Sequence, residues 1–136
     1  NYMYPIANML NMIITAGKAG REVVTVPFSQ VKSNIAKVLF DNGYIAGYTK
    51  KTRNAGDILE IVLLYTAPKT LGKSFPRISE IKLVSKPSRR MYAGVRDIRP
   101  IKQGRGLIIL STPKGVISGD TAIAERVGGE VICELW

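Results

Sequence analysis

The sequence contains no histidine and only one cysteine, Cys133, so most of the familiar catalytic and metal-binding side chains are missing. A single cysteine excludes an internal disulfide and a multi-cysteine metal site. Without histidine, the usual nucleophile–base pairs of covalent catalysis cannot be assembled. The ten carboxylates form no acid–base motif by their spacing. We therefore expect a protein that is not an enzyme, binds no metal or cofactor and has no small-molecule substrate.

Long hydrophobic runs are also missing. No apolar run approaches the roughly 18 residues that a transmembrane helix needs, and no signal-peptide pattern opens the chain. Residues 6–14 are apolar, but Asn8 and Asn11 interrupt them. Cys133 falls in the apolar alternation of a strand, which favours a small buried hydrophobe. We expect no membrane partner, and a reducing, cytoplasmic setting fits.

Acidic residues are half as frequent as basic ones. The 136 residues include 20 Lys and Arg against 10 Asp and Glu, which gives a formal charge of +10 and a pI near 10.0. A folded chain this basic usually faces a polyanion, with nucleic acid ahead of an anionic membrane. The alternative is that the charge serves solubility alone. Hydrophobic residues make up 46% of the chain, which is enough for the core of one ordinary domain or two small ones.

The first half of the chain has the pattern of helix, strand, helix, strand, strand. Apolar residues at i, i+3, i+4, i+7 and i+8 from Ile6 form one helical stripe. The expected elements are a helix from Pro5 to near Gly17, a strand at 22–26, a helix from the N-cap Ser29 to Gly43, and strands at 44–52 and 58–66. Polar residues, Lys32 among them, are expected on the outer face of the second helix. Two helices on one face of a small sheet make an α+β unit.

Residues 67–76 carry two prolines, a glycine and two lysines, which is the composition of a linker. We place the boundary there, between an amino-terminal α+β domain at 1–73 and a carboxyl-terminal β-rich domain at 74–136. The second domain reads as strands at 77–85, 90–93, 106–112 and 130–135, with one short helix at about 120–127 that leaves through Gly128. The predicted fold class is α+β, with two small α+β domains, the second mostly antiparallel β.

A basic segment from Lys82 to Lys114 gives the strongest indication of a partner. It holds nine Lys or Arg against one acid, Asp97. The cations are Lys82, Lys86, Arg89, Arg90, Arg96, Arg99, Lys102, Arg105 and Lys114. Cations gain affinity for a nucleic acid by releasing its counterions, and an aromatic such as Tyr92 offers a face on which a base can stack. The hydroxyls between them can fix the position of the nucleic-acid backbone. The alternative is a solvated basic face without a partner, and Gly104-Arg105-Gly106 within it is better explained as a turn than as a nucleotide motif.

Residues 111–115, Ser-Thr-Pro-Lys-Gly, follow an apolar strand and are expected to form a loop on a rigid base. Gly115 permits the backbone to approach a ligand closely. Glu130 comes directly after two glycines. Its carboxylate either accepts a hydrogen bond from the exocyclic amine of a base or anchors a loop by accepting hydrogen bonds from amides, and the second role is favoured. Lys50, Lys51 and Arg53 form a smaller basic cluster that ordinary surface also explains.

Six segments together resemble bacterial-type small-subunit ribosomal protein eight over nearly the whole chain. They are Pro5–Leu10, Val26–Ser29, Ile35–Leu39 with Asn42–Ile45, Ser85–Tyr92, Ser111–Val116 and Val127–Val131. Each is weak alone, but their order and spacing make the likeness specific. The resemblance implies two α+β domains and a primary binder of the central domain of small-subunit rRNA that helps to organise the platform.

The resemblance also implies which residues bind RNA. By motif, the recognition loop is Ser111, Thr112, Lys114 and Gly115, with Tyr92 and Glu130 beside it. We expect phosphate contacts from Lys86, Arg89 and Arg90, and secondary contacts from Lys50, Lys51, Ser29 and Lys32.

Two departures from the family pattern concern RNA contacts. Near its start, the family usually reads Asp-Pro-Ile-Ala-Asp-Met-Leu-Thr-Arg-Ile-Arg-Asn. In this chain, Met12 and Ile14 replace the two arginines and Thr15 replaces the asparagine. Pro113 stands where the family loop commonly has a second serine. Binding should therefore rest mostly on the second domain.

The expected function is that of a structural protein of the small ribosomal subunit in the cytoplasm, which binds 16S-type rRNA. Its expected partners are the central domain of that rRNA and neighbouring small-subunit proteins. The resemblance adds its own messenger RNA as a further candidate, because some bacterial members of the family repress its translation. The alternative is a free RNA-binding translational repressor that uses the same surface. An enzyme acting on RNA is disfavoured because histidine and metal-ligand clusters are missing.

Overall fold

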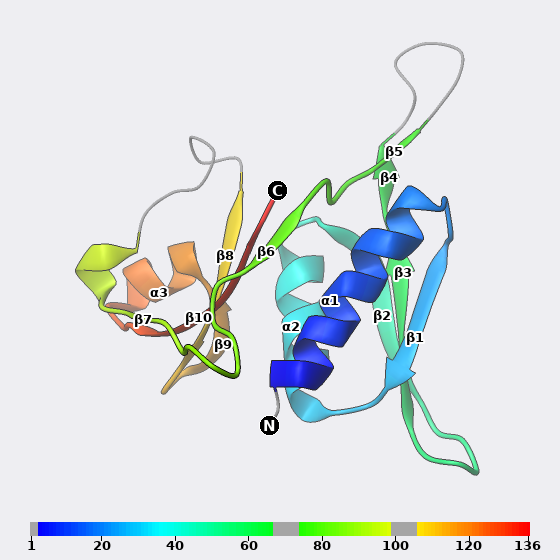
Figure 1. The fold of residues 1–136 in the computed structure, drawn as a ribbon, viewed down its shortest axis with the longest axis horizontal. Helices are drawn as coiled ribbons and strands as arrows, with labels where there is room; N and C mark the ends of the chain where they lie inside the picture. The colour runs from blue at the N-terminus through cyan, green and yellow to red at the C-terminus, as the bar shows by residue number, and fades with distance from the viewer. Residues whose placement is uncertain (1–2, 67–73, 99–105) are drawn as a thin grey trace. The chain divides into compact units, whose positions relative to one another are not determined.

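Figure 1 shows the computed structural model, which describes residues 3–66, 74–98 and 106–136. The chain divides into two compact units, Asn8–Ser79 and Glu80–Trp136 with Asn1–Ala7. We call them the amino-terminal and the carboxyl-terminal unit. Both combine helices with antiparallel strands, so the predicted α+β class is confirmed.

The amino-terminal unit has the predicted order of elements. They are α1 (Met3–Lys18), which belongs to this unit from Asn8 on, β1 (Val23–Pro27), α2 (Gln30–Asp41), β2 (Ile45–Lys51) and β3 (Ile58–Leu63). The strands form an antiparallel sheet in the order β1-β3-β2, and Figure 1 shows both helices on one face of it. Alternate residues of β3 (Leu59, Ile61 and Leu63) are buried because successive side chains of a strand point to opposite faces.

Local signals define both ends of α2. The Ser29 hydroxyl accepts a hydrogen bond from the Lys32 backbone N–H at 3.3 Å, so Ser29 is the predicted N-cap. After the helix, Gly43 has φ +77°, the left-handed conformation that glycine adopts without strain. The prediction that Gly43 ends this helix is confirmed.

A two-stranded ribbon closes the amino-terminal unit. β4 (Tyr65–Thr66) pairs with β5 (Phe75–Pro76), and residues 67–73 between them lie outside the described residues. The predicted domain boundary at 73/74 falls in this region and stays a prediction. None of the helices in the described part of the chain has the length and hydrophobicity that a membrane crossing requires.

The carboxyl-terminal unit is mostly antiparallel sheet. Its elements are β6 (Ile81–Leu83), β7 (Tyr92–Ala93), the 3-10 helix η1 (Val95–Asp97), β8 (Leu107–Thr112), β9 (Gly115–Ser118), α3 (Gly119–Glu125) and β10 (Gly129–Leu135). The sheet order is β6-β10-β8-β9, and β7 pairs with β10 as well. Leu110, Ala122 and Val131 form part of a buried cluster that joins α3 to the sheet.

Three details of this unit differ from the sequence-based expectation. Residues 111–115 are not a loop but the end of β8, a two-residue turn and the start of β9, because Gly115 (φ +106°) lets the chain fold back. The strand expected at 77–85 is only β6, three residues long. The helix closes at Arg126, in a left-handed conformation, rather than at Gly128.

Candidate nucleic-acid interface

Three predicted site residues lie in one row across the sheet of the carboxyl-terminal unit. Glu130 of β10 pairs with Tyr92 of β7 on one side and with Ser111 of β8 on the other. Residues that are directly opposite in antiparallel strands project to the same face of a sheet. Tyr92 is 72% exposed, so its ring is available for stacking. The sheet therefore brings an aromatic, a carboxylate and a hydroxyl together.

The two hydroxyls of the β8–β9 hairpin have different surroundings. The Thr112 hydroxyl accepts from the Lys114 backbone N–H at 3.1 Å and donates to the Gly115 carbonyl at 2.8 Å, so it closes the turn. The Ser111 hydroxyl makes no hydrogen bond with any other residue that the structure describes, and Ser111 is half-buried. Ser111 is thus the hydroxyl that can meet a ligand, whereas Thr112 shapes the turn.

Lys114 connects this turn to α3. Its Nζ lies 3.2 Å from Oε2 of Glu125, with both side chains about half exposed (54% and 43%). An exposed ion pair of this kind contributes little to stability and exchanges readily with other partners. Lys114 can therefore leave Glu125 for a phosphate.

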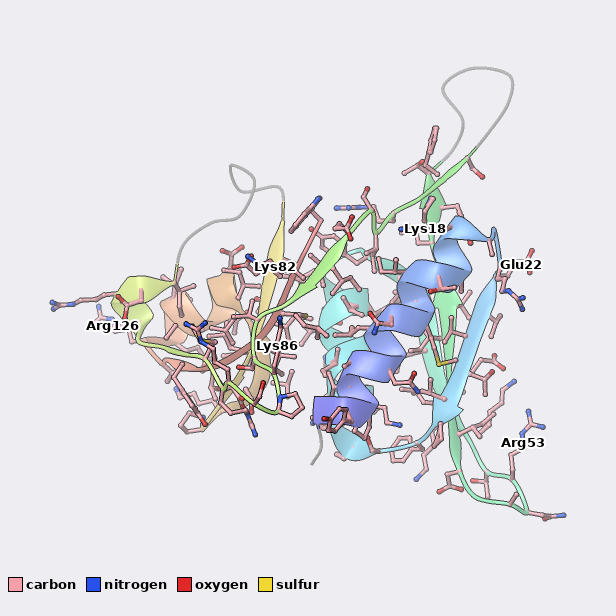
Figure 2. The ribbon with its side chains drawn as sticks, viewed as in Figure 1. Lys18, Glu22, Arg53, Lys82, Lys86 and Arg126 are labelled. Carbon is pink, nitrogen blue, oxygen red and sulfur yellow. The ribbon has the colours of Figure 1, made fainter. Side chains whose placement is uncertain are left out.

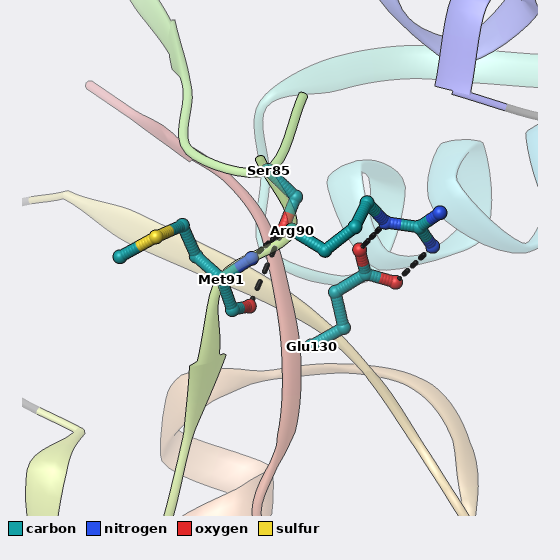
Figure 3. Close-up of polar contacts among 4 residues, drawn as sticks. All are labelled: Ser85, Arg90, Met91 and Glu130. Carbon is teal, nitrogen blue, oxygen red and sulfur yellow. Dashed lines mark hydrogen bonds and ion pairs between the residues drawn. The ribbon is translucent and has the colours of Figure 1, made fainter. Parts of the chain in front are cut away.

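Glu130 holds an arginine. Figure 3 shows the Arg90 guanidinium against its carboxylate: Nε donates to Oε2, and Nη2 donates to Oε1 at 2.7 Å. Glu130 is buried, so its carboxylate is shielded from solvent, whereas the Arg90 side chain is 30% exposed. Glu130 anchors Arg90 in this structure, and the paired geometry fixes the orientation of the guanidinium. The pairing, between residues 40 positions apart, could not be read from sequence spacing.

Ser85, one of the hydroxyls interleaved with the cations of the basic segment, closes a loop of the candidate site, and the sequence analysis did not assign it this role. It is fully buried, and its hydroxyl donates to the Met91 carbonyl at 3.2 Å and accepts from the Met91 N–H at 2.8 Å (Figure 3). Inside this closure, Lys86 and Arg89 form a β-bridge around Pro87 and Ser88. The loop presents Lys86 and Arg89 to solvent. The turn-forming Pro-Ser pair between two cations was the available signal.

Two glycines let these strands approach each other. A Cβ on Gly128 would lie 2.3 Å from the Ala93 carbonyl oxygen, and one on Gly129 would lie 2.1 Å from the Ser111 carbonyl oxygen. Both obstacles are backbone atoms, which cannot move aside as side chains do. The glycine pair is therefore required for β10 to begin between β7 and β8, and it sets the spacing of Tyr92 and Ser111.

The predicted secondary contacts lie in the amino-terminal unit and all have partners within it. Lys32 is only 6% exposed; its Nζ donates to the Pro27 carbonyl at 2.5 Å, and burial lowers its pKa. The expectation that Lys32 lies on the outer face of its helix is wrong, because its amine reaches back toward the preceding strand. Ser29 is the N-cap described above.

Lys50 and Lys51 are exposed, but both contact other side chains of the amino-terminal unit. Lys50 lies 4.5 Å from the centroid of the Phe28 ring and 3.5 Å from Asp57, and Lys51 lies 2.9 Å from Glu60. Their assignment as RNA contacts remains a prediction.

The remaining cations of the basic segment fall into two groups. Lys82, Lys86, Arg89 and Arg96 are exposed, and Figure 2 shows Lys82 and Lys86 projecting from the carboxyl-terminal unit. The second group lies outside the described residues and consists of Arg99, Lys102 and Arg105. The turn expected at 104–106 lies outside them too, except for Gly106. Among the residues that the structure describes, no group of three or more His, Cys, Asp or Glu side chains could hold a metal ion.

Comparison with known proteins assigns the chain to a family. The family model described as ribosomal protein S8 matches residues 4–136. Among curated proteins, the small ribosomal subunit protein uS8 of Ruegeria pomeroyi is 44% identical over 133 residues, 97% of this chain and 98% of that protein. The uS8 protein of Hyphomonas neptunium is 41% identical over 136 residues, 100% of this chain and 99% of that protein. That of Porphyromonas gingivalis is 39% identical over 132 residues, 97% of this chain and 98% of that protein.

These matches extend from the first helix to the last strand and include the β8–β9 hairpin, the Gly128–Gly129 pair and the Ser85–Met91 loop. The family model covers nearly the whole chain, and the relatives exceed a third identity along their own full lengths. The resemblance seen in the sequence is thereby confirmed, and the chain belongs to the ribosomal protein S8 family.

Proposed function

We propose that the protein binds the central domain of small-subunit rRNA and helps to assemble the platform of the small ribosomal subunit. Its family is one of non-enzymatic ribosomal proteins, and its relatives are proteins of the small subunit. The finer assignment, to the central domain and to assembly, follows the family resemblance and is supported by the surface described above.

The row of Tyr92, Glu130 and Ser111 is the observation that carries this proposal. A stacking face and a hydroxyl stand at fixed positions on a sheet, beside a carboxylate that is already paired with Arg90. RNA with an irregular internal loop presents unstacked bases, 2′-hydroxyls and phosphates close together. A rigid row of different groups suits such a target better than a regular helix, whose phosphates are evenly spaced.

The cations around this row divide into two roles. Lys86 and Arg89 are exposed, and Lys114 has only an exchangeable partner, so these three supply phosphate contacts. Arg90 is held by Glu130, so it contributes geometry rather than a free charge. The proposal therefore assigns affinity mainly to the first three cations and shape reading to the row.

The proposal is tested by binding to a central-domain rRNA fragment as a function of salt. With four to eight phosphates neutralised, the log–log slope of affinity against salt should be roughly −3 to −7. A footprint on whole small-subunit rRNA should show protection within the central domain. An unrelated RNA of equal length serves as the control and should bind more weakly with no discrete footprint.

Two outcomes would contradict the proposal. A slope near zero would remove the phosphate contacts, and protection outside the central domain would remove the proposed target. Sedimentation of the native protein separates a ribosomal constituent from a free regulator, since a constituent leaves small subunits only at high salt or in denaturant.

A further inference from the structure

The helices α1, α2 and α3 of the described residues end in the same pair of backbone hydrogen bonds. After α1, the N–H of Gly20 bonds to the Gly17 carbonyl at 3.2 Å and that of Arg21 to the Ala16 carbonyl at 2.9 Å. This is the helix-ending turn that places one residue in the left-handed conformation, and that residue is usually glycine. Gly20 fits the rule with φ +73°.

The ends of α2 and α3 show the same turn with different residues. Gly43 and Tyr44 bond to carbonyls at 3.0 and 2.9 Å after α2, and Arg126 and Val127 do so at 3.2 and 3.0 Å after α3. Arg126 has φ 56° and ψ 46°, and it is the one non-glycine residue with positive φ in the described part of the chain. A side chain in this conformation is strained because Cβ crowds the following carbonyl. Glycine would satisfy this turn at lower cost.

No contact with another residue that the structure describes accounts for the arginine. Arg126 is exposed, and among the described residues no hydrogen bond or ion pair of its side chain is present. The neighbouring carboxylate of Glu125 lies 3.2 Å from Lys114 instead. The strained conformation of Arg126 therefore has no structural purpose in the described part of the chain, which points to a contact with another molecule.

The location of Arg126 indicates which contact this is. The Glu125–Lys114 pair joins the end of α3 to the β8–β9 turn, and Arg126 directly follows Glu125, the ion-pair partner of a proposed phosphate-binding lysine. Figure 2 shows Arg126 at the opposite end of the carboxyl-terminal unit from Lys82 and Lys86. A guanidinium matches phosphate with two parallel hydrogen bonds.

We infer that Arg126 binds an RNA phosphate and extends the RNA-binding surface from the β8–β9 turn to the end of α3. The inference rests on the proposed function, because it adds a contact to the same surface. A phosphate contact would explain why this position holds an arginine, although the turn alone favours glycine.

The test exploits the opposite effects that this inference predicts for one substitution. Arg126→Gly should raise the melting temperature, because glycine adopts the left-handed conformation freely. The same change should weaken binding to the central-domain fragment about three- to tenfold at low salt and make the salt slope shallower by about one unit. Arg126→Asn removes the charge with a residue that tolerates this conformation, and it should weaken binding equally. Arg126→Lys should keep most of the slope.

Arg21→Gln provides the matched control. It removes one exposed positive charge from the amino-terminal unit, where the hydrogen bonds of Arg21 to other described residues involve only its backbone N–H and carbonyl, and it should leave affinity and slope unchanged. Wild-type binding by both Arg126→Gly and Arg126→Asn would overturn the inference and indicate another partner, such as an acidic protein. If Ser111→Ala still weakens binding in that case, the proposed function survives alone. If no variant affects binding, both fail.

Discussion

The hydroxyls of Ser111 and Thr112 are adjacent in sequence but have different tasks. Thr112 makes two hydrogen bonds within its own turn, whereas Ser111 makes none with another described residue. A motif of two hydroxyls therefore combines one structural residue with one whose hydroxyl bonds to no other described residue. The sequence predicted both as contacts because it cannot show which hydroxyl the turn uses.

Single substitutions should separate these tasks. Ser111→Ala should leave the free energy of unfolding nearly unchanged and reduce cognate RNA binding by about 0.5–1.5 kcal/mol, the net value of one neutral hydrogen bond. Thr112→Ala should lower the free energy of unfolding by about 1 kcal/mol, because two turn bonds are lost. Chemical denaturation and RNA titration measure the two effects, with Thr112→Ser as the control that keeps the hydroxyl. Equal loss of stability in both alanine variants would mean that Ser111 is structural too.

Cys133 contributes a pH dependence of stability. It is fully buried in β10, and burial, followed by the charge of Glu134, raises its pKa from 9.0 to about 12. Above pH 9.0 the thiol ionises in the unfolded chain but stays protonated in the folded one. Stability from the buried thiol is therefore complete below pH 9.0 and is lost as the pH rises toward 12.

The measurement compares wild type with Cys133→Ala, so that the titration of all other groups cancels. The difference in free energy of unfolding should shrink by about 1.4 kcal/mol for each pH unit above 9.0. A difference that stays constant over roughly two pH units above 9.0 would show that the thiol ionises equally in both states.

At the level of elements, the start of β10 controls the geometry of the site. Gly128 and Gly129 allow this strand to enter between β7 and β8, where any Cβ would meet backbone oxygens. The positions of Tyr92 and Ser111 thus depend on two residues that cannot contact RNA through side chains. An enlarged residue there should disturb folding and recognition together.

Gly129→Ala tests this dependence. Its Cβ would lie 2.1 Å from the Ser111 carbonyl oxygen, so we expect a loss of about 1–3 kcal/mol in the free energy of unfolding and weaker cognate RNA binding. Gly47→Ala is the matched control in β2, because nothing lies within 4 Å of its added Cβ. Equal stability of the two variants, measured by urea denaturation, would show that β10 can shift to accommodate the methyl group.

The sequence predicted elements best where the pattern is long and local. The apolar stripe from Ile6 and the signals at Ser29 and Gly43 lie within single helices and gave α1 and α2 correctly. β9 was missed because four residues carry little periodicity and its pairing depends on Gly115. The end of α3 was placed at Gly128 because glycine usually takes the role that Arg126 has here.

The site was predictable as a set of residues but not as a set of contacts. Motif and charge identified Tyr92, Ser111 and Glu130, which the sheet does bring together. The Arg90–Glu130 pair and the turn bonds of Thr112 depend on tertiary pairing, for which spacing gives no signal. Lys32 appeared exposed because only a three-dimensional structure shows its amine bonded to Pro27.

At the level of the whole molecule, the cations behind the net charge of +10 differ in their surroundings. In the amino-terminal unit, Lys50 and Lys51 face Asp57 and Glu60. In the carboxyl-terminal unit, Lys86 and Arg89 are exposed on a closed loop. Equal numbers of cations should therefore contribute unequally to RNA binding.

Two triple variants of the full chain, each with three fewer positive charges, measure this inequality. Replacing Lys86, Arg89 and Lys114 with Gln should make the salt slope shallower by about three units and greatly weaken rRNA binding. Replacing Lys50, Lys51 and Arg53 with Gln should change the slope by less than about one unit. Equal losses in salt titrations of both variants would mean that net charge, and not this surface, determines affinity.

The strand order of the carboxyl-terminal unit also has a consequence for biosynthesis. β10 follows β6, β7 and β8 in the chain, and it pairs with all three of them. The β1-β3-β2 sheet, in contrast, is complete in the nascent chain once Leu63 has been added. Since domains generally fold as units and the amino-terminal one first, the β1-β3-β2 sheet should form on the nascent chain before the sheet of the carboxyl-terminal unit can. Recognition of rRNA is then confined to chains whose translation has passed Leu135.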